Sequence, residues 1–157
     1  MRLSEILAPS SIKHGWPSNV KSLKKTKWSL FEAMIDLAII ESDKKDETLK
    51  QVKEREKSMT TGIGEGIAIP HASLHFLQEP VGSMVILPEG LDFDSIDQKK
   101  AQFILLILLP KKDFTSHIRT LASASRFLHN KTVREILIAE NDSEKIYQVV
   151  SEYDKKT

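Results

Sequence analysis

The alternating glycines of 62–66 constrain the fold more than any other part of the chain. Glycine adopts positive φ without strain, so this run predicts a tight change of direction. An apolar segment follows at once and predicts a short buried strand over 67–71. Because Pro70 donates no backbone hydrogen bond, we expect the strand to stop there and to present the ring of His71 at its end.

The remaining apolar pattern predicts helices and strands along the whole chain. Helices on both sides of the predicted strands give an α/β fold, a three-layer α/β/α arrangement around a mixed central sheet of about five strands. At 157 residues, we expect a single domain over 1–157. The expected helices lie over 24–40, within 41–57 and over 113–129, and the further expected strands lie around 12–16, 81–87 and 101–109.

Composition excludes several classes of protein. A net charge of +1 supplies no basic field for nucleic acid. Because the chain has no cysteine, it forms neither disulfides nor thiolate zinc sites. The longest apolar run, 103–109, is far shorter than the ~20 residues that span a bilayer. The chain also begins without an apolar signal segment, so we expect a cytoplasmic protein with no stable membrane insertion.

The residues around His71 indicate phosphate chemistry. A neutral imidazole is a good nucleophile, and histidine forms covalent intermediates in group transfer. Successive N–H groups of a glycine-rich turn can form a concave site for an anion. Together these features indicate a histidine that is presented to a phosphate.

The same residues resemble a known family. Glu54-Arg55-Glu56-Lys57 and the following TTGIGEGIAIPHA of 60–72 are similar to the active-site signature of the type 2 IIA proteins of the bacterial phosphotransferase system, the fructose/mannitol and nitrogen-regulatory group. FILLILLP at 103–110, HIRTL at 117–121 and NKTVR at 130–134 resemble that family's strand, second histidine and C-terminal helices. The latter two segments are closest to the nitrogen-regulatory branch.

The resemblance implies a role for each site residue. His71 would accept a phosphoryl group on its tele nitrogen, Nε2, from an HPr-like phosphocarrier, so the chain would be both catalyst and substrate of a phosphotransferase relay. His117 would support the phosphoryl group, and Arg55 would stabilise its charge. The phosphate-loop candidates are Gly62, Gly64, Glu65 and Gly66, although the carboxylate of Glu65 repels phosphate unless it orients an imidazole or contacts the donor. No metal or cofactor is implied.

The next acceptor in the relay has two interpretations. The chain contains no IIB or IIC segment, which favours a regulatory protein that controls its partners through its phosphorylation state. The alternative is a sugar-specific IIA component that passes the phosphoryl group to a cysteine of a IIB domain. Ala72 and Ser73 depart from the glycine, often followed by a basic residue, that many relatives carry after the histidine, so the choice of partner is open.

Other interpretations are weaker. A dinucleotide-binding loop follows a strand and opens a helix, whereas here a helix precedes the glycines and a strand follows them. His71 and His75 have a spacing known from zinc sites, but Pro70 argues against one helix carrying both. Arg55 could instead form a surface ion pair. The remaining histidines, His14 and His129, are expected at the surface or partly buried, as is His75.

Overall fold

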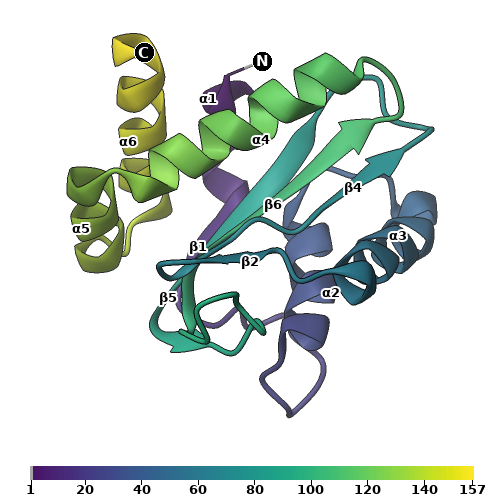
Figure 1. Ribbon diagram of the computed structural model, residues 1–157, viewed down its shortest axis with the longest axis horizontal. Helices are drawn as coiled ribbons and strands as arrows, with labels where there is room; N and C mark the ends of the chain where they lie inside the picture. Colours follow the sequence, from purple (N-terminus) through teal and green to yellow (C-terminus); the bar gives the residue numbers. More distant parts are fainter. Residues whose placement is uncertain (1) are drawn as a thin grey trace.

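The computed structural model of the protein describes residues 2–157 (Figure 1). Its helices are α1 (Leu3–Ile6), α2 (Lys27–Leu37), α3 (Lys45–Ser58), α4 (Phe114–His129), α5 (Lys131–Ala139) and α6 (Ser143–Lys156), with short 3-10 turns at Pro9–Ser11 and Ser42–Lys44. Its strands are β1 (Ile12–His14), β2 (Gly62–Gly64), β3 (Ile67–Ala68), β4 (His71–Leu74), β5 (Val81–Leu91) and β6 (Ala101–Pro110). No helix within residues 2–157 is both long enough and apolar enough to cross a membrane.

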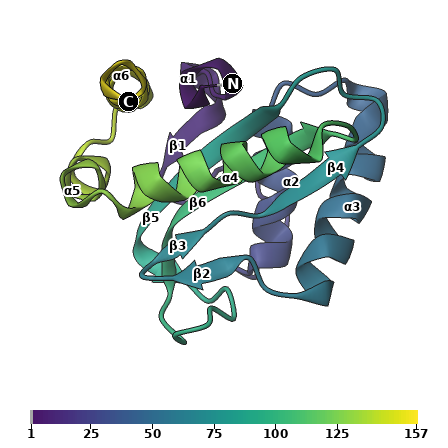
Figure 2. The ribbon, with the colours of Figure 1, turned by 45° about the horizontal axis from the view of Figure 1, so that its top comes forward.

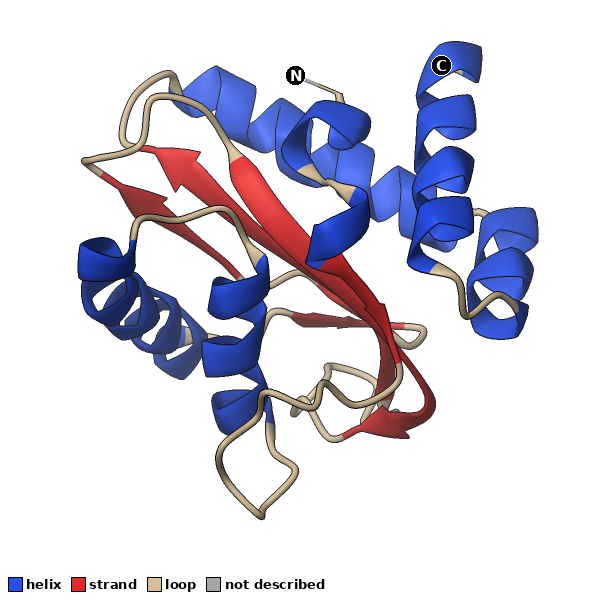
Figure 3. Ribbon diagram, turned by 180° about the vertical axis from the view of Figure 1, so that it is seen from behind, coloured by secondary structure: helices blue, strands red, loops and turns tan. Residues whose placement is uncertain are grey.

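The six strands form one mixed sheet in the order β1-β5-β6-β3-β2, with β4 also paired to β6. The long strands β5 and β6 are antiparallel, whereas β3 and β4 run parallel to β6, and β1 runs parallel to β5. Helices cover both faces (Figures 1 and 3). The predicted three-layer α/β/α fold with a mixed sheet is therefore confirmed.

Strand β6 divides the core into two halves, because its side chains alternate between the faces of the sheet. One face packs against α1, α4, α5 and α6, and the opposite face packs against α2 and α3 (Figure 2). Both sets of β6 side chains are buried, as the continuously apolar sequence predicted. The first set is Phe103, Leu105, Ile107 and Leu109, and the second is Ile104, Leu106 and Leu108.

The predicted strand over 67–71 is interrupted rather than ended at Pro70. Strand β3 stops at Ala68, and β4 begins at His71, so the expectation that His71 closes a strand is wrong. Pro70 lacks an N–H, but its carbonyl accepts from the N–H of Ile107 at 3.0 Å. This bond keeps β4 paired with β6 in the register that β3 began.

The glycine run forms a hairpin. Strand β2 pairs antiparallel with β3, and Glu65 and Gly66 form the turn between them with φ of 57° and 80°. Positive φ at both turn positions suits the right-handed twist of a hairpin, which explains the glycine. The change of direction predicted from the sequence is thus present, but 62–64 is itself a strand.

Candidate active site

A cavity of about 450 Å³ lies between α3, β4 and the beginning of α4. This volume is in the range of sites for small ligands. The cavity brings together Arg55, His71 and His117, which come from three separate elements. Its other lining residues are Gln51, Glu54, Ala72, Ser73, Leu109, Lys111, Phe114, Ile118 and Leu121.

The first residue of β4 is His71, and its ring is fixed by the backbone next to it. The ring Nδ1 lies 2.9 Å from the carbonyl oxygen of Ile69. Since a carbonyl only accepts, Nδ1 carries the proton and donates, and Nε2 keeps its lone pair. The break at Pro70 therefore determines the tautomer as well as the position of the ring.

Burial lowers the pKa of His71 below its usual value of 6.5. The positive charge of Arg55 and the nearby His117 act in the same direction, whereas the bond to Ile69 and the charge of Glu56 act against it. The imidazole is consequently neutral at neutral pH. A neutral ring with an unprotonated Nε2 is a competent nucleophile.

The partner histidine, His117, lies in the first turn of α4. Asp113 caps this helix with φ of 58°, and its carboxylate accepts from the N–H of Ser116 at 3.3 Å. The Nε2 atom of His117 is buried and has no hydrogen-bond partner among residues 2–157. Buried polar atoms are nearly always hydrogen-bonded, so this nitrogen is available to a group that enters the cavity.

The guanidinium of Arg55 enters the cavity from the last turn of α3. Its Nη1 donates to the carbonyl oxygen of Met59 at 2.8 Å, which holds the side chain against the end of its own helix. Within residues 2–157 no carboxylate lies at ion-pair distance from Arg55, so the surface ion pair considered from the sequence is not formed. The guanidinium retains donors for an anion.

The buried carboxylate of Glu56 supports this arrangement and was not anticipated from the sequence. Its Oε2 lies 2.9 Å from the Nζ of Lys27, and it accepts from the N–H of Thr61 at 2.9 Å. These contacts join the end of α3 to α2 and to the segment before β2. A signal was present in the sequence: Glu56 follows Val52 by one helical turn, on the buried face of a helix that otherwise reads as charged.

The predicted phosphate loop does not line this cavity: Gly64, Glu65 and Gly66 lie at the start of β3, and Gly62 pairs with Ala68 at its end. The carbonyl of Gly66 accepts from Phe103, whereas His71 pairs with Ile107, about 13 Å further along β6 at the usual rise of a strand.

Two N–H groups of this run already donate to side chains. Gly62 donates to Oγ1 of Thr60 at 3.1 Å. Glu65 donates its N–H to the Oδ2 of Asp97 at 2.8 Å, and this bond lowers the pKa of the Asp97 carboxyl, together with a bond from Lys99. An ionised carboxylate therefore occupies the place that the sequence assigned to phosphate. The Glu65 side chain pairs with His129 at 3.2 Å rather than orienting His71.

Neither His14 nor His75 lines the cavity. The Nε2 of His14 lies 3.0 Å from the carbonyl oxygen of Ile138, and His75 is exposed at the end of β4. With His129 they are at the surface or partly buried, as expected.

Comparison with known proteins identifies the family of the chain. Residues 18–153 match the family described as "Phosphoenolpyruvate-dependent sugar phosphotransferase system, EIIA 2". The chain is 35% identical over 129 residues to the fructose-specific EIIA component of Haloferax volcanii, which is 81% of this chain and 84% of that protein. It is 28% identical over 151 residues to a nitrogen regulatory protein of Bradyrhizobium diazoefficiens, 96% and 95% of the two chains.

A solved structure extends the likeness to three dimensions. The nitrogen regulatory protein IIA-Ntr of Neisseria meningitidis superposes with a TM-score of 0.80 at 25% identity, over 94% of this chain and 98% of that one. The family match covers nearly the whole chain and includes each element that lines the cavity. The chain belongs to the EIIA type 2 family of the phosphoenolpyruvate-dependent sugar phosphotransferase system.

Proposed function

We propose that the chain is a phosphohistidine carrier in which Nε2 of His71 accepts a phosphoryl group from an HPr-like phosphocarrier. The bond between Nδ1 and the carbonyl of Ile69 carries the proposal, because it leaves Nε2 unprotonated in a cavity that also holds Arg55 and His117. The lowered pKa of His71 keeps the ring neutral and nucleophilic.

The transfer balances without an external acid or energy source. Nε2 of His71 forms a bond to phosphorus while the phosphorus–nitrogen bond of the donor phosphohistidine breaks. The donor ring carries a proton on its other nitrogen, so it leaves with the electron pair as a neutral imidazole, and the positive charge passes to the ring of His71. His71 retains its Nδ1 proton, which stays hydrogen-bonded to Ile69. Arg55 donates to the phosphoryl oxygens, and His117, in the tautomer with a proton on Nε2, donates as well.

The regulatory role is the form of this function that we favour. A phosphoryl group adds about −1.5 to −2 charges at pH 7. That charge would arrive at a cavity whose rim carries two exposed apolar side chains, Phe114 at 77% and Ile118 at 56% exposure. The rim presents a surface on which a partner protein would sense the change. The nitrogen regulatory protein of B. diazoefficiens, similar over nearly the full length of both chains, supports this branch.

The second candidate is passage of the phosphoryl group to a cysteine of a IIB domain in fructose/mannitol-type uptake. The 35% identity to a fructose-specific EIIA component favours it. Both candidates share the chemistry at His71 and differ only in the acceptor.

Intact mass after incubation with phosphoenolpyruvate, enzyme I and HPr tests the proposal. We expect the native chain to gain one acid-labile phosphoryl group and His71→Ala to gain none. His75→Ala is the matched control, because this histidine is exposed and lies outside the cavity. Labelling of a folded His71→Ala chain would refute the assignment. Addition of a fructose-type IIB domain then separates the two roles, since rapid transfer to its cysteine supports the sugar-specific one.

A further inference from the structure

A second cavity lies at the end of the sheet away from His71, between α5, β6 and the turn of the β2–β3 hairpin. It has two adjoining lobes that share Gln102 and Arg134 as lining residues. The lobe against α5 has a volume of about 390 Å³, and the lobe at the hairpin has about 360 Å³. The first is lined further by Phe103, Lys131, Glu135 and Ile138, and the second by Glu65, Gly66, Lys99 and Lys100.

Positive charge gathers around this second cavity. Four of its lining residues are cations, Lys99, Lys100, Lys131 and Arg134, in a chain whose net charge is only +1. None of the four forms an ion pair with a carboxylate of residues 2–157. The carboxylate of Asp97, which accepts from the N–H groups of Glu65 and Lys99, balances only part of this positive charge. The remaining cations repel one another, and a bound anion would reduce that repulsion.

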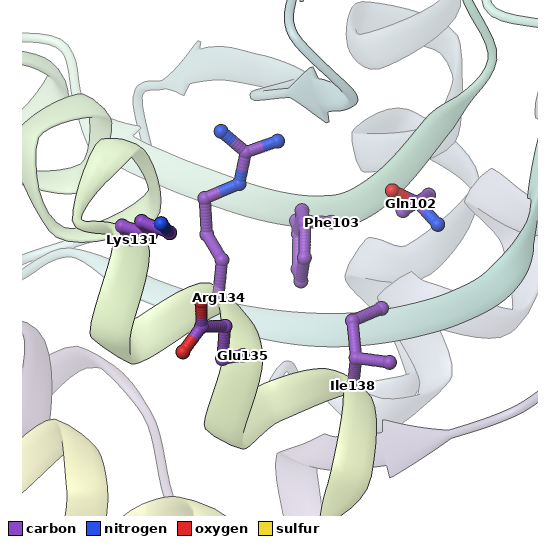
Figure 4. A pocket seen from close by; sticks show the side chains of 6 residues that line it. All are labelled: Gln102, Phe103, Lys131, Arg134, Glu135 and Ile138. Atoms are coloured by element: carbon purple, nitrogen blue, oxygen red, sulfur yellow. The ribbon is translucent and has the colours of Figure 1, made fainter.

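The two carboxylates of the lining do not neutralise these cations. Glu65 turns its side chain to His129, at 3.2 Å. Glu135 is exposed on α5, and Figure 4 shows it beside the base of Arg134 rather than at the guanidinium. The second cavity therefore keeps a net positive charge.

The guanidinium of Arg134 is held in place before any ligand arrives. Its Cζ lies 5.4 Å from the centroid of the Phe103 ring, and Nη2 donates to the carbonyl oxygen of Glu65. Arg134 and Lys131 project from α5, while Phe103 and Gln102 come from β6 (Figure 4). A guanidinium has five donors, so this one retains N–H groups for an anion in a fixed orientation.

Neighbouring residues keep the second cavity open and supply an acceptor. Gln102 donates from Nε2 to the carbonyl oxygen of Pro88 at 2.8 Å, which leaves its Oε1 free to accept. A Cβ at Gly66 would stand 3.4 Å from this oxygen and 3.7 Å from Nη2 of Arg134. Gly66 thus leaves space between the amide and the guanidinium that a side chain would occupy.

We infer that the second cavity is a binding site for a small phosphate monoester, separate from the site at His71. The phosphate lies against Arg134, Lys99 and Lys100, and the organic part lies against the partly exposed apolar side chain of Ile138. The free oxygen of Gln102 accepts from a hydroxyl or amine of the ligand. Binding is reversible and involves no covalent step.

Titration with three probes at constant ionic strength tests this inference: inorganic phosphate, glucose 6-phosphate and adenosine monophosphate, with glucose and adenosine as phosphate-free controls. Amide NMR shifts locate the binding, with Gly66 and Lys131 reporting on the second cavity and Ser73 on the cavity of His71. We expect saturable shifts at Gly66 and Lys131 for a phosphate monoester at up to about 10 mM, tenfold above a Kd of about 1 mM.

Two substitutions sharpen the test. Arg134→Gln should weaken the binding at least about tenfold, which corresponds to about 1.4 kcal/mol. Arg126→Gln removes an exposed arginine of α4 outside both cavities and should leave the affinity unchanged. Lys100→Gln, on an exposed side chain, provides a second test that does not disturb the contact with Glu65.

The outcomes of this titration are independent of the phosphorylation test at His71. Preference for one monoester identifies the organic part and supports the inference, as does equal binding of both. The inference is overturned if no probe binds, if inorganic phosphate binds as tightly as either monoester, or if only Ser73 responds. It is overturned equally if Arg134→Gln and Lys100→Gln both bind as the native chain does.

Discussion

The buried ion pair between Lys27 and Glu56 should be the most sensitive polar contact of this fold. The side chain of Glu56 is 0% exposed and that of Lys27 is 5% exposed, with Nζ and Oε2 2.9 Å apart. The substitution Lys27→Met keeps the length of the side chain but removes its charge. It leaves a carboxylate in the core with donors from Thr61 alone.

The expected loss of stability follows from this geometry. Removing one partner of a buried ion pair costs about 3–5 kcal/mol, because the remaining charge is buried without compensation. Two hydrogen bonds from Thr61 still reach Glu56, so we expect a value near the lower limit, about 3 kcal/mol. For a chain of 157 residues, this lowers Tm by about 6–12 °C.

Urea titration and calorimetry measure this loss, and two further variants interpret it. The double variant Lys27→Met with Glu56→Gln should be more stable than Lys27→Met alone, because the amide can still accept from Thr61 and carries no charge. Lys145→Met is the control, since Lys145 is exposed and lies 4.0 Å from Glu140, so its loss should leave Tm unchanged.

Two results would contradict a buried, uncompensated charge at Glu56. The first is a change in the free energy of unfolding of Lys27→Met of less than about 1 kcal/mol, the range of a surface pair. The second is a further loss of stability when Glu56→Gln is added to Lys27→Met, because removal of the uncompensated charge should raise the stability.

Three other predictions test the site and the sheet. His117→Ala should slow phosphorylation of His71 in a stopped assay of phosphoryl transfer while the acceptor survives, and an unchanged rate would make its unpartnered Nε2 irrelevant to transfer. Burial holds the pKa of His71 in the folded chain below its usual value of 6.5. As the pH falls below that value, the unfolded chain binds more protons than the folded chain, so the free energy of unfolding falls. Tm should therefore drop more between about pH 7.5 and pH 5.5 in the native chain than in His71→Ala, and equal drops would contradict the lowered pKa. Gly82→Ala would place a Cβ 2.3 Å from the carbonyl oxygen of Leu106, so thermal denaturation should show a loss of about 1–3 kcal/mol, and a stable variant would mean that β5 and β6 separate easily.

Local features of the structure followed from the sequence. The apolar run of β6 and the positive φ of the glycine turn depend on neighbouring residues, so periodicity and residue type were sufficient to predict them. The family also followed, because its motif is a continuous segment that ends at His71. The bounds of the strand at Pro70 did not follow from the sequence. Pairing with β6 resumes after the proline because the N–H of Ile107 on the partner strand bonds to the carbonyl of Pro70.

The tertiary structure decided which residues meet. Arg55 and His117 reach the cavity because α3 and α4 approach β4 from different sides of the sheet, and helical periodicity has no information on that approach. Gly66 is only five residues from His71 in the sequence, yet β3 and the segment to Pro70 are extended, so Gly66 lines another cavity. Glu56 is buried for the same kind of reason: its charge is tolerated only where Lys27, brought by a separate helix, can pair with it. The sequence by itself therefore determined most of the helices and strands and the candidate nucleophile, whereas the packing of distant elements determined the surroundings of His71.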